Sequence, residues 1–238
     1  MDMRINKYLA QAHIASRREA DKLIIAKRVT INGVTAEIGS RVGETDHVCL
    51  DGKEISLSRR WTVVAFYKPE GVVCTRKDEH AKKTIYDVFH YPVLLNYAGR
   101  LDSNSEGLMI MTDDGMLIDA MMRAKMGHEK EYIVTIKGEV SKDFIKKMSE
   151  GIFLEELKQT TRPCFAEKLS EHSFRIILTQ GLNRQIRRMC KSLGEEVTEL
   201  KRVRIVNIRL GKLKPGEYRE IEGEERKKLY EMVGLKDE

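Results

Sequence analysis

Residues 99–115 decide the fold, and they read Gly99-Arg100-Leu101-Asp102-Ser103-Asn104-Ser105-Glu106-Gly107, Leu108-Met109-Ile110-Met111-Thr112 and Asp113-Asp114-Gly115. The Ser, Asn and Gly residues after Asp102 predict a loop, the apolar run predicts a buried strand, and Asp-Gly predicts a turn. A carboxylate on a loop that a core strand anchors is typical of an active site. An aspartate that only stabilises the turn has the same local sequence. Taken alone, this stretch favours an aspartate that only stabilises the turn.

The composition is that of a soluble globular protein. The chain has 238 residues, of which 41% are hydrophobic and 34% are charged, and this leaves no room for a long disordered or low-complexity region. Lys and Arg number 43 against 37 Asp and Glu, giving a net charge of +6. That excess is too small to identify a nucleic-acid-binding protein, so the clustering of the basic residues has to decide.

Several site types are not supported by the sequence. The four cysteines are far apart in the chain, so they predict reduced thiols of a cytoplasmic protein rather than a zinc or disulfide framework. The histidines lack the spacing of metal ligands, and the chain has no Gly-x-Gly-x-x-Gly or P-loop motif. No apolar run has the length of a signal peptide core or a membrane span. We therefore expect no cofactor, no metal ion and no membrane partner.

Residues 1–58 are predicted to form a small separate unit. Ile5 and Leu9 have helical spacing, Ser16 and Glu19 have the spacing of a capping box, and Asn-Gly and Asp-Gly pairs predict two hairpins. The polar stretch 56–60 is the expected linker, so residues 59–238 form the second unit.

Residues 59–238 alternate strand and helix patterns, and several of the connections resemble hairpins. This predicts an α+β fold with a mixed, mostly antiparallel sheet flanked by helices. The strands are expected at 61–67, 108–112, 133–136, 174–179 and 200–210, and the helices at 116–124, 141–148, 183–193 and 224–232.

Basic residues gather at the starts of two predicted helices. Arg17 and Arg18 occupy the first turn of one helix, where the helix dipole disfavours cations, so they predict a phosphate-binding site. On the helix that begins at Asn183, one face is expected to follow a phosphate backbone, and Arg187 points away from it toward the core. The other basic residues that we expect to contact RNA are Arg4, Lys7, Lys27, Arg28, Arg184, Arg188 and Lys191.

Two family resemblances are visible in these motifs. The segments 4–9, 16–21 and 29–33 resemble the S4-type RNA-binding domain, which is a pair of helices on a small sheet. The segments 68–71, 99–108, 130–132 and 183–189 resemble the pseudouridine synthases, specifically the RsuA/RluB/RluE/RluF family that joins an S4-type domain to a catalytic domain. Within that family, the segments 128–132 and 181–190 are most similar to the RluF group.

The resemblance implies a cofactor-free isomerase that converts a uridine to pseudouridine in a stem-loop of large-subunit (23S) ribosomal RNA. It places the catalytic aspartate at Asp102, the tyrosine that stacks on the base at Tyr132, and the arginine that pairs with the aspartate at Arg187. The target uridine has to be flipped out of the RNA, so Arg100 is expected to fill the gap or hold the phosphate, and Lys130 to contact RNA. Whether tRNA is also a substrate stays open, and a monomer is expected.

Two other functions fit parts of the sequence. A non-catalytic RNA-binding or ribosome-assembly factor on the same fold explains the basic helix starts equally well, but it has no use for Asp102, Tyr132 and Arg187 as a set. A metal-dependent nuclease would use Asp113 and Asp114, although Asp-Gly turn chemistry explains both residues.

Overall fold

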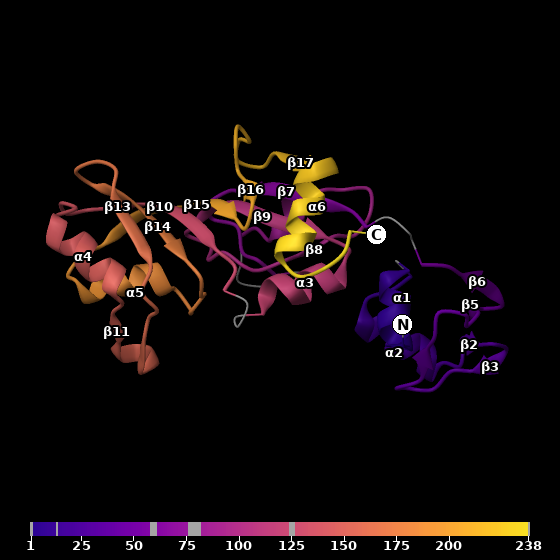
Figure 1. Cartoon of the computed structure of the whole chain (residues 1–238). Coiled ribbons are helices and arrows are strands. Elements are labelled where there is room, and N and C mark those ends of the chain that lie inside the picture. The colour runs from indigo at the N-terminus through magenta and orange to yellow at the C-terminus, as the bar shows by residue number, and fades with distance from the viewer. Residues whose placement is uncertain (1, 13, 58–60, 76–81, 124–126, 238) are drawn as a thin grey trace.

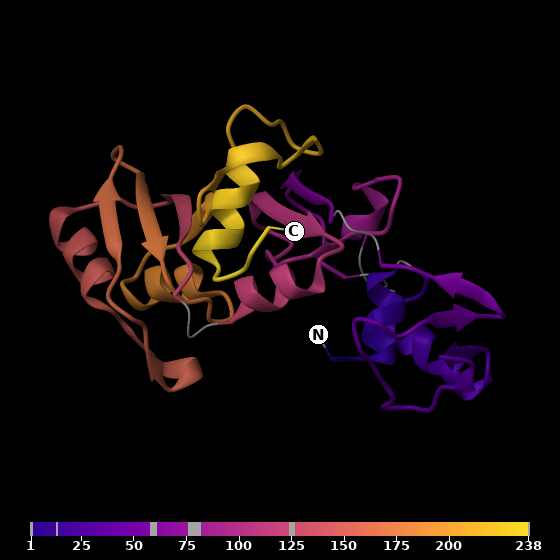
Figure 2. The same ribbon diagram turned by 45° about the vertical axis from the view of Figure 1, so that its right-hand side comes forward.

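The computed structural model describes residues 2–12, 14–57, 61–75, 82–123 and 127–237. It has the α+β fold that the sequence predicts, with a small N-terminal unit followed by a larger unit built on a nine-stranded sheet. In Figures 1 and 2 the N-terminal unit lies at one end of the molecule, and α4 (Lys142–Glu150) and α5 (Gln185–Ser192) lie at the other. Residues 58–60 of the expected linker lie outside the described residues, as does Ala124, the predicted end of a helix.

The N-terminal unit packs two helices on small sheets, as predicted. The capping box at the start of its second helix is confirmed, since the Glu19 amide donates to Ser16 Oγ at 3.3 Å and the Ser16 amide donates to Glu19 Oε2 at 2.9 Å. Both hairpins are confirmed too, and Asn32-Gly33 and Asp51-Gly52 adopt the positive φ angles that such turns need. Its elements are β1 (Met3–Arg4), α1 (Ile5–Gln11), α2 (Arg17–Ile25), β2 (Val29–Ile31), β3 (Val34–Thr35), β4 (Arg41–Val42), β5 (Val48–Leu50) and β6 (Lys53–Ile55).

The large sheet is mixed and mostly antiparallel. Its strand order is β13-β14-β10-β15-β9-β7-β17, and the parallel pair is β9 with β15. The strands are β7 (Val63–Lys68), β8 (Asn96–Tyr97), β9 (Glu106–Thr112), β10 (Lys130–Ile136), β13 (Phe165–Lys168), β14 (Ser173–Leu178), β15 (Val197–Ile205), β16 (Ile208–Arg209) and β17 (Tyr218–Glu220). The other elements are the helices α3 (Gly115–Met122) and α6 (Gly223–Met232), the hairpin β11 (Phe153–Leu154) with β12 (Gln159–Thr160), and the 3-10 turns Ile85–Asp87 and Glu155–Leu157.

Strands β7 and β9 are buried on both faces, which explains their continuous apolar sequences. Alternate side chains of β9 enter two different cores. Leu108 and Ile110 pack with α3 and α6, and Met109 and Met111 pack on the opposite face with Phe66. Strand β9 is therefore fixed from both sides, and so is the chain that enters it from Asp102.

The ends of the predicted elements differ from the observed ends, mostly by one to three residues, and in two elements a positive φ angle explains the difference. Helix α5 begins at Gln185 rather than Asn183, because Arg184 adopts the left-handed conformation with φ at 51°. The predicted strand 200–210 is broken between β15 and β16, where Val206 has φ at 53° and the chain turns back on itself. A positive φ is rare for both residue types, so helix and strand periodicity cannot predict these positions.

The parallel contact between β9 and β15 brings two backbones unusually close together. Gly107 pairs with Arg202, and a Cβ atom on Gly107 would lie 2.3 Å from the Arg202 carbonyl oxygen and 2.7 Å from its nitrogen. Gly107 also has φ at 112°. Both observations require glycine at this position.

We predict that Gly107→Ala destabilises the protein by about 2 kcal/mol or more, because the methyl group meets backbone that cannot move aside and the φ angle is strained. Gly115→Ala is the matched control, because nothing lies within 4 Å of the added Cβ, and it should change stability by no more than about 0.5 kcal/mol. Urea unfolding of both variants measures the difference. Equal stabilities would contradict the tight contact.

Candidate active site

A cavity of about 520 Å³ lies beside the β9–β15 contact. Its walls come from the loop before β9, the starts of β10 and α5, the end of α3, and the middle of β15. The residues with chemically active side chains on these walls include Asp102, Lys130, Tyr132, Arg184 and Arg202. The structure thus brings Asp102 and Tyr132, which the sequence singled out 30 residues apart, into one site.

Hydrogen bonds within the Asp102 loop and from the β7 side hold this loop in place. The Ser105 amide donates to the Asp102 carbonyl at 3.1 Å, and the Gly71 amide donates to the Ser103 carbonyl at 2.7 Å. Lys68 Nζ donates to the carbonyls of Ser105 and Pro69, both at 2.8 Å. Such contacts leave the loop little freedom, so the carboxylate that it carries has a defined place.

Arg184 is the arginine that pairs directly with Asp102. Its Nη1 lies 3.9 Å from Asp102 Oδ2 and donates to Asn104 Oδ1 at 3.3 Å. The Asp102 side chain is 35% exposed, so the carboxylate faces the cavity and can be reached from it. The left-handed backbone at Arg184 explains why this residue leaves the helical face on which it was expected.

Arg187 does not make the ion pair with Asp102 that the resemblance implied. Its guanidinium donates to the carbonyls of Asn104 and Val197, the second at 2.9 Å. Arg187 therefore fastens the Asp102 loop to α5 and β15 through the backbone. Burial lowers the pKa of Arg187, the nearby Arg184 lowers it further, and the negative charge of Asp102 acts in the opposite direction. The two residues are thus close enough to interact electrostatically.

Tyr132 lies on β10 directly opposite Arg202 of β15. Its side chain is half-buried and packs against two of the hydrophobic cores, while another part of it lines the cavity. Tyr132 therefore presents an aromatic surface at a fixed position on the wall.

The basic residues predicted to contact RNA fall into three groups. Arg100, Lys130 and Arg184 line the cavity. Arg28, Arg188 and Lys191 make ion pairs within the protein: Arg28 with Asp51, and the other two with Glu156. The basic face that was expected along α5 is therefore not free for RNA, because Glu156 of the 3-10 turn Glu155–Leu157 pairs with two of its side chains. The residues of the third group are on the N-terminal unit, namely Arg4, Lys7, Arg17, Arg18 and Lys27.

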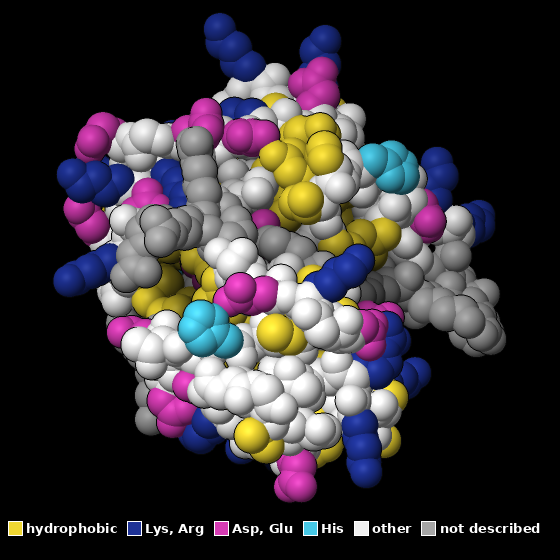
Figure 3. Space-filling model, turned by 90° about the vertical axis from the view of Figure 1, so that its right-hand side faces the viewer, with side chains coloured by type: hydrophobic (Ala, Val, Ile, Leu, Met, Phe, Trp, Pro, Cys, Tyr) yellow, Lys and Arg dark blue, Asp and Glu magenta, His cyan; other side chains and the backbone are white. Residues whose placement is uncertain are grey.

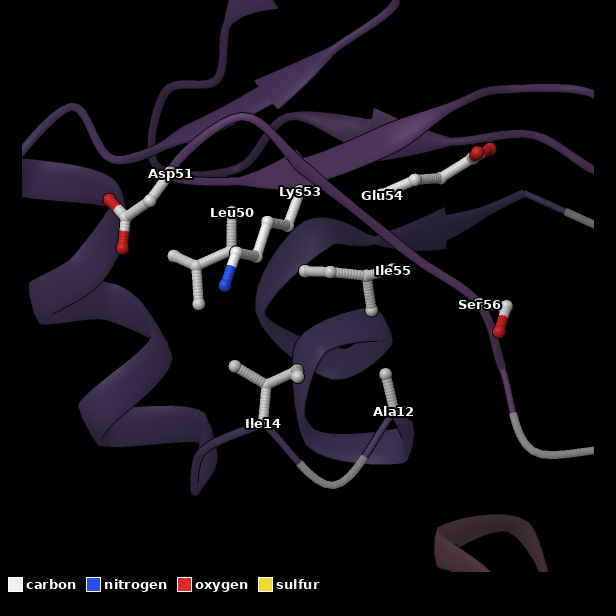
Figure 4. A pocket seen from close by; sticks show the side chains of 8 residues that line it. All are labelled: Ala12, Ile14, Leu50, Asp51, Lys53, Glu54, Ile55 and Ser56. Atoms are coloured by element: carbon white, nitrogen blue, oxygen red, sulfur yellow. The ribbon is translucent and has the colours of Figure 1, made fainter.

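The N-terminal unit has a hollow of its own, of about 380 Å³ (Figure 4). Its lining mixes aliphatic side chains such as Ile14 and Leu50 with Asp51, Lys53 and Glu54. Two acids against one lysine do not suit a polyanion. On the end of the molecule shown in Figure 3, Lys and Arg side chains are spread around the edge and do not form one patch.

The described part of the chain has neither a metal-binding cluster nor a membrane-spanning helix. No group of His, Cys, Asp and Glu there has the arrangement of a metal site. Asp114 caps α3 by accepting from the Met116 and Leu117 amides, and Asp113 accepts from the Thr62 amide at 2.8 Å. Both aspartates thus have structural partners. None of the described helices is long and apolar enough to span a bilayer.

Two buried cations at this site were missed by the sequence reasoning. Lys68 is fully buried and Arg202 is 2% exposed. The sequence contains a feature that could have indicated the burial of each residue. Lys68 ends an apolar strand, and strand alternation places Arg202 on the same face as the buried Leu200. Burial lowers the pKa of Lys68 to about 8.

Comparison with known proteins gives consistent matches. The family described as RNA pseudouridylate synthase matches residues 62–192, and the S4 domain matches residues 3–48. The chain is 39% identical to the dual-specificity RNA pseudouridine synthase RluF of Salmonella typhi over 97% of this chain and 79% of that protein. It is 34% identical to the ribosomal large subunit pseudouridine synthase B of Vibrio cholerae over 100% of this chain and 77% of that protein. A crystal structure of a pseudouridylate synthase superposes with a TM-score of 0.69 at 31% identity, covering 95% of this chain and 99% of that one.

The lowered pKa of Lys68 predicts a dependence of stability on pH. The folded protein loses this proton from about pH 8, while an unfolded lysine keeps it to about 10.5. The unfolded state binds more protons in that window, so the contribution of Lys68 to stability increases as the pH rises from 8 to 10. The unfolding free energy of the wild type should therefore rise relative to that of Lys68→Met, measured in urea at both pH values. If the difference in unfolding free energy between the wild type and Lys68→Met were the same at both pH values, the lowered pKa of Lys68 would be contradicted.

Proposed function

Because the chain belongs to the RNA pseudouridylate synthase family and carries an S4 domain, we propose that it isomerises a specific uridine in large-subunit ribosomal RNA. The activity is that of an RNA pseudouridine synthase, an isomerase. Relatives at 34% identity are named for the large and for the small ribosomal subunit, and both names support ribosomal RNA as the substrate. The relative from Salmonella typhi is named a dual-specificity enzyme, so tRNA is our candidate for a second substrate.

The observation that carries the proposal is Asp102 itself. It is a carboxylate on a rigid loop, it faces a cavity large enough for a base, and arginine side chains surround it. In the reaction the bond from the sugar C1′ to N1 breaks, a bond from C1′ to C5 forms, and the proton lost from C5 is balanced by one gained at N1. Asp102 would act as the nucleophile or as a stabilising charge, attacking either the sugar or the base.

We assign different roles to the other two residues that the family resemblance named. Tyr132 offers an aromatic face on which the flipped uracil can stack, and a phenol for proton movement. Arg187 acts as a positioning residue, because it holds the backbone of Asn104 and so keeps the Asp102 loop in place. Arg184 supplies the positive charge next to the carboxylate.

RNA binding is assigned to two regions. We propose that residues 1–58 form the RNA-binding unit and residues 59–238 the catalytic unit, acting together as a monomer. Separate hydrophobic cores in the two parts support this division.

Arg17 and Arg18 are exposed on the first turn of α2, where free amides also attract phosphate, with Arg4, Lys7 and Lys27 on the same unit. At the cavity, Arg100, Lys130 and Arg184 would hold the target nucleotide. RNA phosphates would compete with Asp51 for Arg28 and with Glu156 for Arg188 and Lys191.

We predict that Asp102→Asn forms no measurable pseudouridine, a loss of about a thousandfold or more, because the amide is neither a nucleophile nor a negative charge. Ribosomal RNA from a strain lacking the gene is incubated with each purified protein, and pseudouridine is mapped with a selective carbodiimide. The binding affinity for that RNA should stay within about threefold. Asp119→Asn, on the exposed side of α3, is the matched control and should remain active. If Asp102→Asn formed pseudouridine at the wild-type rate, Asp102 would not take part in the reaction.

We predict that the double variant Arg17→Ala, Arg18→Ala binds RNA more weakly and reduces the slope of log affinity against log salt concentration by about 2. At saturating RNA its turnover should be close to that of the wild type, because the cavity is unchanged. Lys227→Ala with Lys228→Ala removes the same charge from the exposed side of α6. An equal loss of slope in this control pair would show that net charge, and not the start of α2, determines binding.

A further inference from the structure

Arg202 has one guanidinium nitrogen without a partner among the described residues. Its Nε donates to the Leu108 carbonyl at 2.7 Å, and its Nη1 donates to the Arg100 carbonyl at 3.5 Å. Its Nη2 is buried and has no hydrogen-bond partner. A buried charged donor that is left unsatisfied is costly, so such a group in a native structure calls for an explanation.

The surroundings of Arg202 point to an acceptor that comes from outside the protein. Arg202 lines the cavity and lies opposite Tyr132 across the β10–β15 pair. Lys68 of β7 and Lys130 of β10 lie close enough to Arg202 to feel its charge: burial lowers the pKa of both lysines, and the positive charge of Arg202 lowers it further. Cations gathered this closely favour a ligand that accepts hydrogen bonds and carries or develops negative charge.

The depth of Arg202 decides which part of an RNA can reach it. Arg202 is 2% exposed, whereas Arg100, which also lines the cavity, is exposed and Arg184 retains 43% exposure of its side chain. A phosphate remains in the RNA backbone at the mouth of the cavity, within reach of Arg100 and Arg184. A base that is flipped out of the RNA enters edge-first and reaches the wall. Tyr132 beside Arg202 provides the face against which that base would lie.

We propose that Nη2 of Arg202 donates a hydrogen bond to a ring carbonyl oxygen of the flipped uracil. This rests on the proposed function. When the bond from C1′ to N1 breaks, the base keeps the bonding electron pair, and part of that negative charge resides on its carbonyl oxygens. A fixed guanidinium stabilises this charge more than it stabilises the neutral base, so Arg202 is a catalytic residue in addition to those already named.

The test replaces the acceptor on the RNA and the donor on the protein in turn. Three stem-loop RNAs carry uridine, 2-thiouridine or 4-thiouridine at the position that the carbodiimide mapping identifies. Sulfur accepts hydrogen bonds weakly, so one of the two thio bases should lower kcat/KM of the wild type about tenfold or more. Arg202→Lys keeps the charge but lacks the second nitrogen, and it should show a similar loss with uridine.

The decisive result is the combination of the two changes. If Nη2 donates to the carbonyl, kcat/KM of Arg202→Lys should be the same with the sensitive thio base as with uridine. The proposal would be overturned if the thio base and Arg202→Lys each lowered kcat/KM by their own factor and the two factors multiplied. It would also be overturned if the wild type had the same kcat/KM with uridine and with both thio bases. Arg204→Lys is the control, because Arg204 is on the same strand and is held by Glu129 and Glu131. It should show the same thio effect as the wild type. Failure of the proposed function is a separate outcome, in which the wild type makes no pseudouridine even from the uridine RNA.

Discussion

The close approach of β9 and β15 at Gly107 and Arg202 is the contact on which the site depends. Here the two halves of the large sheet meet, with β13-β14-β10-β15 on one side and β9-β7-β17 on the other. Each half has its own hydrophobic packing, and the cavity lies where they join. Because a side chain at position 107 would collide with backbone, glycine lets the Asp102 loop and Arg202 reach the same place.

The Asp102 loop is fixed by groups from three directions. Lys68 binds it from β7, Arg187 binds it from α5, and Arg202 binds the carbonyls of Arg100 and Leu108 on either side of it. All three are cations that donate to backbone oxygens, so they orient the loop without neutralising its carboxylate. A carboxylate positioned before the substrate arrives avoids the cost of ordering it during the reaction.

Local signals in the sequence predicted local structure well. The capping box at Ser16, the two Gly-containing hairpins and the buried strand after Asp102 each depend on neighbouring residues, and each is confirmed. The choice of arginine next to Asp102 could not be predicted in this way. It depends on the left-handed backbone at Arg184, which places this residue, rather than Arg187, against the carboxylate. The pairing of Glu156 with Arg188 and the burial of Lys68 and Arg202 depend equally on contacts between distant segments.

The most direct test of this arrangement is a crystal structure with a stem-loop RNA that carries 5-fluorouridine at the target position. Fluorine replaces the C5 proton that must leave, so the reaction stalls with the base in the site. The base should lie in the cavity against Tyr132, next to Asp102, with a ring carbonyl about 3 Å from Arg202 Nη2. A base that stays stacked in the RNA, or that binds away from Asp102, would contradict both the site and the role of Arg202.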